Sequence, residues 1–301
     1  MNNTHSYIND ERNASVYINI DGNLIKRSEA KISVFDSGFL LGDGVWEGIR
    51  LYNGKLAFKE EHFKRLYDGI NKLEIKMSMT PLELENQIMD TINANHMVTD
   101  VHIRLIVTRG LKMTPYQHPS ANIGKSTIVI IPEYKIADPT MYENGITLVS
   151  VDTIRSTPEI QDPKINSLSK FNCIQACIEA ANKGGDEGLM LDINGYVSTC
   201  NSTNFFMIKN EQVITSKGMY CLNGVTRQNI INICEENNIP IILKDFKIAD
   251  VYEADAAFVT GTFAGVIPIT QIDHYKLNSE NFNIIDMLFK LYKQKIEFLY
   301  S

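Results

Sequence analysis

The sequence has little cysteine and little proline. Of its 301 residues, only five are cysteine and nine are proline. No two cysteines are spaced as CxxC, and no pair of histidines follows at the spacing of a zinc ligand set. A framework held by disulfides or zinc is therefore not indicated, and no metal site is expected. We expect buried, reduced thiols at Cys173, Cys177, Cys200, Cys221 and Cys234.

The chain also lacks an excess of positive charge. Lys and Arg total 29 whereas Asp and Glu total 36, which gives a net charge of -7 at pH 7. Nucleic acids and anionic membranes are bound largely through clustered positive charge. We therefore expect neither as a partner.

Long hydrophobic runs are absent as well. No apolar run approaches the ~20 residues that a membrane-spanning helix needs. Residues 1–13, MNNTHSYINDERN, are polar and lack the apolar centre of a secretory signal. These features predict a cytoplasmic protein that does not cross a membrane.

The common nucleotide-binding motifs are missing too. No GxxxxGK[ST] loop occurs, and Gly38, Gly42 and Gly44 lack the spacing of a dinucleotide fingerprint. Neither nucleotide hydrolysis nor NAD chemistry is therefore favoured.

What is present is an ordinary globular composition, with 44% hydrophobic and 22% charged residues. At roughly 150 residues per domain, the length suggests two domains. Asp21-Gly22 and Asn53-Gly54 lie between apolar runs and predict two hairpin turns. Periodicity predicts helices over about 60–73 and 81–97, then strands over 101–110 and 126–134.

Residues 134–144 lose this periodicity, gain Pro139 and mix charges, as linkers between domains do. We therefore expect a small N-terminal domain over 1–133, a linker over 134–144 and a larger domain over 145–301. The larger domain shows clustered strands and three helices, over about 170–183, 226–237 and 283–299. Strands that cluster instead of alternating with helices predict an α+β fold.

Several segments could hold an anion. Thr226 precedes an apolar-periodic helix, so it is a candidate N-cap whose neighbouring amides could bind phosphate, although by itself the segment favours a plain capped helix. Thr260-Gly261-Thr262 interrupts a strand, as an oxyanion-binding turn or a simple bulge would. Arg65 is either a surface charge or a phosphate ligand.

One strand and one helix carry further candidates. On the strand over 101–110, His102 and Arg104 share a face and Arg109 follows, forming a cationic patch that suits a carboxylate or simply faces water. Lys164 and Lys170 lie beside a helix with the apolar stripe Ile174, Cys177, Ile178 and Ala181. A lysine buried against that stripe would have a lowered pKa and could act as a nucleophile.

Seven blocks of the sequence resemble blocks of one known family and occur in the same order as in that family. They are FDSGFLLGDGVWEGIR, EEHFKRL, VTRG, GGDEGLMLD, NGYVSTCNSTNFF, LNGVTRQ and VTGTFAGVIPI. Together they resemble the class IV, or fold-type IV, pyridoxal-phosphate aminotransferases, which include branched-chain aminotransferases, D-amino acid aminotransferases and aminodeoxychorismate lyase. The likeness spans nearly the whole chain.

The resemblance implies a two-domain α+β fold with pyridoxal 5′-phosphate between a small N-terminal α/β domain and a larger mixed domain. It also implies a homodimer in which the partner subunit helps to line the site. By position, the cofactor phosphate would be held by Arg65, Val225, Thr226 and Thr262.

The resemblance also places the substrate. Thr262 and Phe263 match a turn whose amides bind the substrate carboxylate, and Arg104 or Arg109 would assist. His102-Ile103-Arg104 resembles the Tyr-x-Arg strand of branched-chain enzymes, whereas VTRG with Arg109 resembles the D-amino acid enzymes, so the handedness of the substrate stays open.

Two positions depart from the family. An ungapped alignment with the family puts Asn166 at the position of the catalytic lysine. One further insertion would bring Lys164 to that position, and a shift in the other direction would bring Lys170 there. We take Lys164 as the expected catalytic residue, with Lys170 as the alternative. Thr199 occupies the position of the cofactor-binding glutamate that keeps the pyridine nitrogen protonated, a role that Asp192 or another acid could assume.

The resemblance thus predicts transamination between an amino acid of branched-chain type and a 2-oxo acid. Asn166 and Thr199 motivate two alternatives. One is a lyase on the same fold, and the other is a divergent homologue that does not use pyridoxal phosphate.

Overall fold

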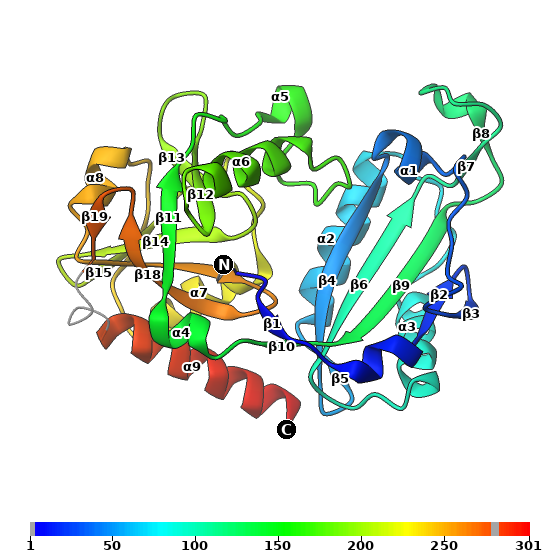
Figure 1. The fold of residues 1–301 in the computed structure, drawn as a ribbon, viewed down its shortest axis with the longest axis horizontal. Helices are drawn as coiled ribbons and strands as arrows, with labels where there is room; N and C mark the ends of the chain where they lie inside the picture. The colour runs from blue at the N-terminus through cyan, green and yellow to red at the C-terminus, as the bar shows by residue number, and fades with distance from the viewer. Residues whose placement is uncertain (1–3, 278–282) are drawn as a thin grey trace.

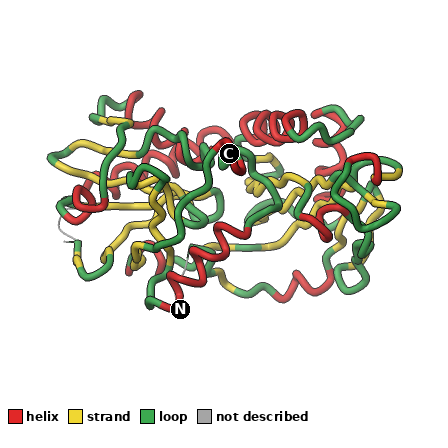
Figure 2. Tube along the Cα trace, turned by 90° about the horizontal axis from the view of Figure 1, so that it is seen from above, coloured by secondary structure: helices red, strands yellow, loops and turns green. Residues whose placement is uncertain are grey.

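The computed structural model describes residues 4–277 and 283–301, which form two bodies side by side (Figure 1). Residues 17–134 supply a six-stranded sheet of order β3-β2-β9-β6-β4-β5. Residues 146–276 supply a nine-stranded sheet of order β13-β12-β11-β18-β17-β14-β15-β16, with β19 added beside β18. The view from above shows strands gathered in both halves (Figure 2). The predicted α+β fold is confirmed.

The smaller body is built from hairpins and two covering helices. Its turn at Asp21 and Gly22 has φ of 52° and 87°, as a two-residue hairpin turn requires. Its elements are β1 (Tyr7–Ile8), β2 (Tyr17–Ile20), β3 (Asn23–Lys26), α1 (Ser37–Leu41), β4 (Gly44–Tyr52), β5 (Lys55–Leu56), α2 (Lys59–Lys72), α3 (Pro81–Ala94), β6 (Val101–Thr108), β7 (Leu111–Lys112), β8 (Asn122–Ile123) and β9 (Thr127–Tyr134), with short 3-10 turns at Glu11–Ser15 and Pro119–Ala121.

The core of this body lies between the sheet and α2 and α3. The alternation read from β6 holds, because Val101, Ile103, Leu105 and Val107 are all fully buried. α3 begins at a capping box in which Thr80 and Glu83 bond to each other's backbone amides. The opposite face of β6 is therefore free to carry polar side chains.

The larger body combines antiparallel hairpins with parallel pairs. Strand β11 runs parallel to both β12 and β18. Its elements are α4 (Thr140–Asn144), β11 (Ile146–Ser150), α5 (Pro158–Gln161), α6 (Phe171–Asn182), β12 (Glu187–Leu191), β13 (Val197–Cys200), β14 (Asn204–Lys209), β15 (Gln212–Thr215), α7 (Val225–Glu236), β16 (Ile241–Leu243), α8 (Ile248–Tyr252), β17 (Ala256–Gly261), β18 (Gly265–Ile272), β19 (Tyr275–Lys276) and α9 (Asn283–Tyr300).

The two sheets fall on either side of the expected linker, 134–144. This segment is nevertheless regular, since β10 (Ile136–Ala137) pairs with β1 and α4 follows directly. β1 and β10 lie where the two bodies meet (Figure 1). A short partner strand from the N-terminus therefore orders residues that look irregular in sequence.

The apolar stripe expected on α6 does not form the packing face. Ile174 and Ile178 are 52% and 56% exposed, whereas Ala176 and Ala180 are buried. The reason is close approach to β12, because a Cβ on Gly188 would lie 3.0 Å from the Ala176 carbonyl. Only small side chains fit there, and the large ones turn outward.

The cysteines are all free, as expected. Cys200, Cys221 and Cys234 are buried, and burial raises the pKa of each thiol. Cys177 is exposed and Cys173 is partly exposed. The expectation of burial is therefore wrong for these two, since both belong to α6 and its outward face.

Candidate active site

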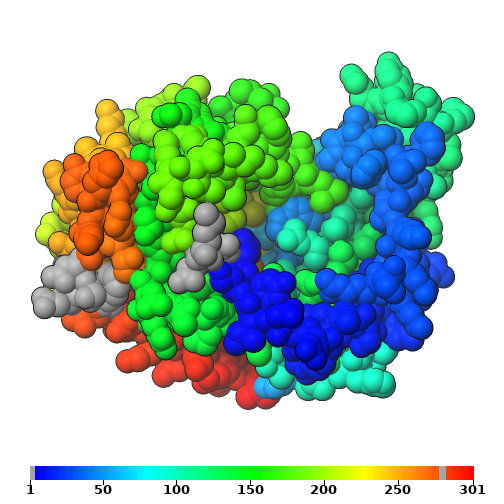
Figure 3. All heavy atoms as spheres, in the orientation of Figure 1, coloured from blue at the N-terminus to red at the C-terminus, as the bar shows by residue number. Residues whose placement is uncertain are grey.

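A cavity of about 430 Å³ is lined by residues of both bodies. Trp46, Arg65 and Arg104 come from the smaller body, and Lys170, Thr226 and Thr262 come from the larger one. The space-filling view shows this face hollowed between the two halves (Figure 3). Its volume is in the range of small-molecule sites.

One part of the cavity wall is built to hold an anion. Helix α7 begins at Val225, with Gly224 as its N-cap and without a side-chain cap, so its first amides face outward from the helix. Thr226 is therefore not the N-cap that the sequence predicts but the second helical residue. Thr260 Oγ1 on the same wall is buried and has no hydrogen-bond partner among the described residues.

Arg65 reaches this wall from α2. Its Nη1 donates to the Asn223 carbonyl at 3.1 Å, while Nε and Nη2 donate to both carboxylate oxygens of Glu47 at 2.7 and 2.6 Å. A guanidinium has five N–H groups, so two remain for a ligand. Burial raises the pKa of Glu47, but Arg65 and His62 outweigh it and hold that pKa below its usual value.

Glu47 was not predicted from the sequence. It lies fully buried on β4 and also contacts His62 Nδ1 at 2.7 Å. The carboxylate therefore fixes Arg65 in place. A charged residue within the apolar run of a central strand was the signal that could have revealed it.

Lys170 lines the same cavity. Its Nζ donates to Asn166 Oδ1 at 2.9 Å and lies 5.4 Å from the ring centroid of Trp46. Burial, helped by Arg155, Arg65 and Arg104, lowers the pKa of Lys170 to about 8, although Cys173 opposes the shift. The amine is thus much easier to deprotonate than an ordinary lysine.

Asn166 is held rigidly beside it. Its Nδ2 donates to the Trp46 carbonyl at 2.7 Å, and the Trp46 amide donates to the Asn166 carbonyl at 2.9 Å. Asn166 therefore binds Lys170 and links it to β4.

Lys164, in contrast, is exposed and outside the cavity. Its Nζ contacts Met219 Sδ at 3.6 Å, and Met219 is itself half exposed. Of the two lysines, the structure brings only Lys170 to the other candidate residues.

Thr199 lines the cavity wall. Its hydroxyl donates to the Thr203 carbonyl at 2.7 Å. Asp192 does not replace a missing acid there, because its carboxylate accepts from the Asn194 and Tyr196 amides in the β12–β13 turn.

A further acid, Glu187, contacts residues of this wall and carried no signal in the sequence. It is buried, its carboxylate accepts from the hydroxyls of Thr4, Ser202 and Thr203, and burial raises its pKa. Ser202 and Thr203 line the cavity, so Glu187 lies behind the wall instead of in it.

Of the two candidate substrate arginines, the structure brings one to the cavity. Arg104 lines it, with its guanidinium 3.7 Å from the Trp46 ring centroid. Arg109 is held elsewhere by Asp43 at 2.7 Å and by the carbonyls of Leu73 and Glu74. Phe263 and Thr262 also line the cavity.

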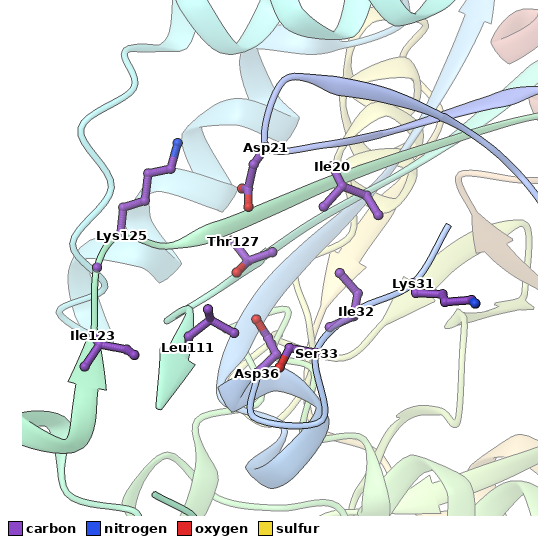
Figure 4. Close-up of a pocket in the computed structure, with 11 residues that line it drawn as sticks. Ile20, Asp21, Lys31, Ile32, Ser33, Asp36, Leu111, Ile123, Lys125 and Thr127 are labelled. Atoms are coloured by element: carbon purple, nitrogen blue, oxygen red, sulfur yellow. The ribbon is translucent and has the colours of Figure 1, made fainter. Parts of the chain in front are cut away.

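A second hollow, of about 370 Å³, lies in the smaller body (Figure 4). Asp21, Asp36 and Lys125 surround it together with the apolar side chains of Ile32, Leu111 and Ile123. It holds none of the candidate site residues.

Within residues 4–277 and 283–301, no three or more His, Cys, Asp or Glu side chains are grouped so that they could hold a metal. No helix in this described part of the chain is long and apolar enough to cross a membrane.

Comparison with known proteins agrees with this geometry. Residues 44–272 match the family model described as amino-transferase class IV. The chain is 36% identical over 263 residues to the branched-chain-amino-acid aminotransferase-like protein 2 of Arabidopsis thaliana, covering 87% of this chain and 46% of that protein. It therefore spans about half the length of that relative.

Two other proteins are matched almost end to end. The D-alanine aminotransferase of Bacillus licheniformis is 30% identical, with 86% of this chain and 89% of that protein covered. The crystal structure of the branched-chain aminotransferase from Thermoproteus uzoniensis with norvaline superposes with a TM-score of 0.83 at 25% identity, covering 95% of this chain and 98% of that one.

Proposed function

This chain belongs to the class IV aminotransferase family, and from that premise we propose that it transfers an amino group between an amino acid and a 2-oxo acid with pyridoxal 5′-phosphate. The observation that carries the proposal is the position of Lys170, whose low-pKa amine lines the same cavity as the anion-binding wall at α7.

The cavity wall fits the phosphate of this cofactor. The α7 amides, the unpartnered Thr260 hydroxyl and the two remaining N–H groups of Arg65 all line one cavity. Val225, Thr226 and Thr262 complete this wall. When bound, the cofactor would supply the electron sink that lets the α-carbon of an amino acid lose its proton.

Lys170 is the residue we propose to join the cofactor and to move the proton, in place of Lys164. A general base works best when its pKa lies near the operating pH, and about 8 meets that condition. Asn166 Oδ1 accepts a hydrogen bond from Nζ and so orients the amine. The family's lysine would thus have been replaced by a pair, Asn166 and Lys170, four residues apart.

We propose Arg104 and the amides of the Thr262-Phe263 turn as the binding groups for the substrate α-carboxylate. Arg104 lies on the smaller body and the turn on the larger one, so the substrate would be held between them. The names of the relatives suggest either a branched-chain amino acid or D-alanine as the donor.

We further propose a cytoplasmic homodimer. The segments around α1 and β7 lie side by side, because the Lys112 amide donates to the Phe35 carbonyl and the Ser37 amide donates to the Gly110 carbonyl. Both segments carry exposed apolar side chains. Phe39 and Met113 on these segments are 71% and 70% exposed. A second copy of the chain would remove this apolar surface from water.

Thr199 favours two rival functions. A neutral hydroxyl cannot hold a proton on the pyridine nitrogen as a carboxylate does, which weakens the electron sink. A lyase with a smaller demand on that sink, or a homologue that works without the cofactor, would tolerate this change.

The test is the absorption spectrum of the purified protein with added pyridoxal phosphate, before and after borohydride. We expect a protein-bound band, and a borohydride-stable pyridoxyl mass on Lys170 by tandem mass spectrometry. Lys170→Ala should lose the adduct, whereas the matched variant Lys164→Ala should retain it. Formation of glutamate from 2-oxoglutarate and an amino acid then tests the transfer itself.

The outcomes separate the candidates. An adduct on Lys170 without glutamate formation would favour the lyase. No adduct at saturating cofactor would favour a homologue that works without it. An adduct on Lys164 would show that the lysine expected from the sequence is the one that binds the cofactor.

A further inference from the structure

A buried arginine beside the cavity lacks an acidic partner. Arg155 is only 9% exposed, and within the described part of the chain it forms no ion pair with an Asp or Glu side chain. Arg65 and Arg109, in contrast, pair with the carboxylates of Glu47 and Asp43. A buried charge without a counter-charge is costly. The group that balances Arg155 must therefore be sought among its other contacts.

That group is the thiol of Cys173. Arg155 Nη1 donates to Cys173 Sγ at 2.7 Å. Cys173 also lies in the first turn of the 12-residue helix α6, whose N-cap Lys170 makes no side-chain cap hydrogen bond. The unpaired amides and the positive end of the helix dipole face this turn. A guanidinium and a helix N-terminus both stabilise a negatively charged sulfur, which is the reactive form of cysteine.

A small hollow of about 20 Å³ adjoins this sulfur. Arg155, Lys170 and Cys173 line both the small hollow and the main cavity, whereas Asn172 lines the small hollow alone. A water molecule needs about 10–15 Å³ of such space. The small hollow therefore has room for one oxygen atom but not for a larger group.

Two buried polar atoms at the small hollow have no hydrogen-bond partner among the described residues. They are a donor, Arg155 Nε, and an acceptor, Asn172 Oδ1. Asn172 Nδ2 donates to the Ile154 carbonyl at 2.8 Å, which fixes the orientation of the amide. Buried polar groups are normally paired. A water molecule would satisfy both atoms, and so would a hydroxyl attached to the neighbouring sulfur.

We propose that Cys173 is a modification site, which hydrogen peroxide oxidises to a sulfenic acid whose hydroxyl lies in the small hollow between Arg155 and Asn172. The charged sulfur attacks one oxygen of the peroxide, so that an S–O bond forms and the O–O bond breaks. The sulfur loses two electrons to the peroxide. The departing hydroxide takes a proton from the solvent and becomes water. Peroxide reaches the sulfur from the main cavity, which Cys173 also lines.

The modification would act on the neighbouring amine. Burial and three arginines lower the pKa of Lys170, whereas Cys173 raises it. Oxidation replaces a charged sulfur with a neutral S–OH group, so Lys170 would lose its proton more easily. The site on Cys173 stands without the proposed function, but any effect on the transfer of an amino group rests on that function.

The test compares Cys173 with Cys177, which lies one turn further along α6. Cys177 is the more exposed of the two, and no cation donates a hydrogen bond to its sulfur within the described residues. The purified protein is treated with hydrogen peroxide at pH 7 together with dimedone, which traps sulfenic acids. Both cysteines lie on one tryptic peptide, whose fragment ions show which sulfur carries the adduct. We expect Cys173 to be labelled at least about tenfold faster, the factor that a charge-assisted hydrogen bond contributes.

Variants test the role of the guanidinium. Arg155→Gln should slow the labelling of Cys173 about tenfold and leave that of Cys177 unchanged. Arg155→Lys should keep most of the rate, because it keeps the charge. Arg12→Gln, a matched change at an exposed arginine, should alter neither cysteine. Thermal melting of each variant shows whether it is folded, and the comparison of the two cysteines in the wild-type chain needs no variant.

The effect on Lys170 is measured by reductive methylation at pH 7, with Lys26, an exposed lysine of β3, as the reference. Cys173→Ser removes the charged sulfur with little change in size. It should speed the methylation of Lys170 at least about threefold. Peroxide should have the same effect on the wild-type chain, dithiothreitol should reverse it, and Cys173→Ser should not respond to peroxide. A methylation rate that Cys173→Ser leaves unchanged would show that the sulfur carries no charge beside the amine.

Equal labelling of Cys173 and Cys177, or faster labelling of Cys177, would overturn the inference, as would a Cys173 rate that survives in Arg155→Gln. If Cys173 is oxidised but no glutamate forms in the transfer assay, the proposed function fails and the modification site stands. If glutamate forms and Cys173 stays reduced in peroxide, the function stands and the modification site fails.

Discussion

The amine of Lys170 is the residue whose chemistry is easiest to isolate, because only its neutral form is a nucleophile. With a pKa of about 8, the neutral fraction should rise through that pH instead of near the usual 10.5. We expect the rate of reductive methylation of Lys170 to reach half its maximum near pH 8, as measured by mass spectrometry of its peptide.

Asn166→Asp provides the matched change for this experiment. A carboxylate beside Nζ would favour the charged amine and move the midpoint up by about one pH unit or more. The peptide bearing Lys26 should respond identically in both proteins. A midpoint that is unaffected by Asn166→Asp would show that Oδ1 does not hold the amine.

The same pKa makes a prediction about stability. Because the folded state holds fewer protons on Lys170 than the unfolded state between pH 8 and 10.5, its burial costs stability below pH 8, and that cost fades by pH 10.5. Lys170→Met should therefore raise the free energy of unfolding by about 2–3 kcal/mol at pH 7 and by much less at pH 10.5.

Urea unfolding at the two pH values measures this difference, with Lys26→Met as the control that should change neither value. A less stable Lys170→Met protein at pH 7 would mean that the contacts to Asn166 and Trp46 outweigh the cost of burying the charge.

These residue-scale roles could be read from the sequence only in part. The sequence analysis named Lys170, Arg104, Thr199 and the α7 start as candidates, because each stands in a motif. Spacing favoured Lys164 over Lys170, since it says nothing about the contact between Asn166 and Trp46, which joins residues 120 positions apart and lies beside Lys170. Contacts of that span are set by the fold.

At the scale of elements, Glu47 joins β4 to α2. It is fully buried and its charge is neutralised by Arg65, so Glu47→Gln would leave a guanidinium without its partner. Breaking a buried pair in this way typically costs about 3–5 kcal/mol. We expect that loss in urea unfolding at pH 7, and we expect it to shrink as the pH falls, because Glu47 stabilises the fold only while ionised.

Glu60→Gln is the matched control on the same helix. Its carboxylate is 86% exposed, so the change should cost little. If Glu47→Gln proves no more destabilising than Glu60→Gln, Glu47 does not anchor Arg65.

Elements with local signals were predictable. The turns at Asp21-Gly22 and Asn53-Gly54, helices α2 and α3 and the alternation of β6 all follow from short-range preferences. The packing face of α6 and the regular structure of residues 134–144 could not be predicted in this way. Both depend on partners far along the chain, namely Gly188 on β12 and the N-terminal strand β1.

At the scale of the whole molecule, the site is shared between two bodies, which no single stretch of sequence could show. Strands β4 and β6 of the smaller body carry Trp46 and Arg104, while Lys170 and the α7 amides belong to the larger body. The family resemblance supplied this arrangement, since motifs that are weak alone gain meaning from their common order.

The oligomeric state is the last property argued at this scale. Phe39 on α1 and Met113 after β7 would lie in the proposed interface, and a charge placed there would have to be buried without a partner. We expect the wild-type chain to sediment as a dimer and Phe39→Glu to sediment as a monomer at micromolar concentration. Phe298→Glu on α9 carries the same charge at a side chain that is 84% exposed, and it should leave the dimer intact. A monomeric wild-type chain would contradict the proposed homodimer, and a dimer that only Phe298→Glu disrupts would place the interface elsewhere.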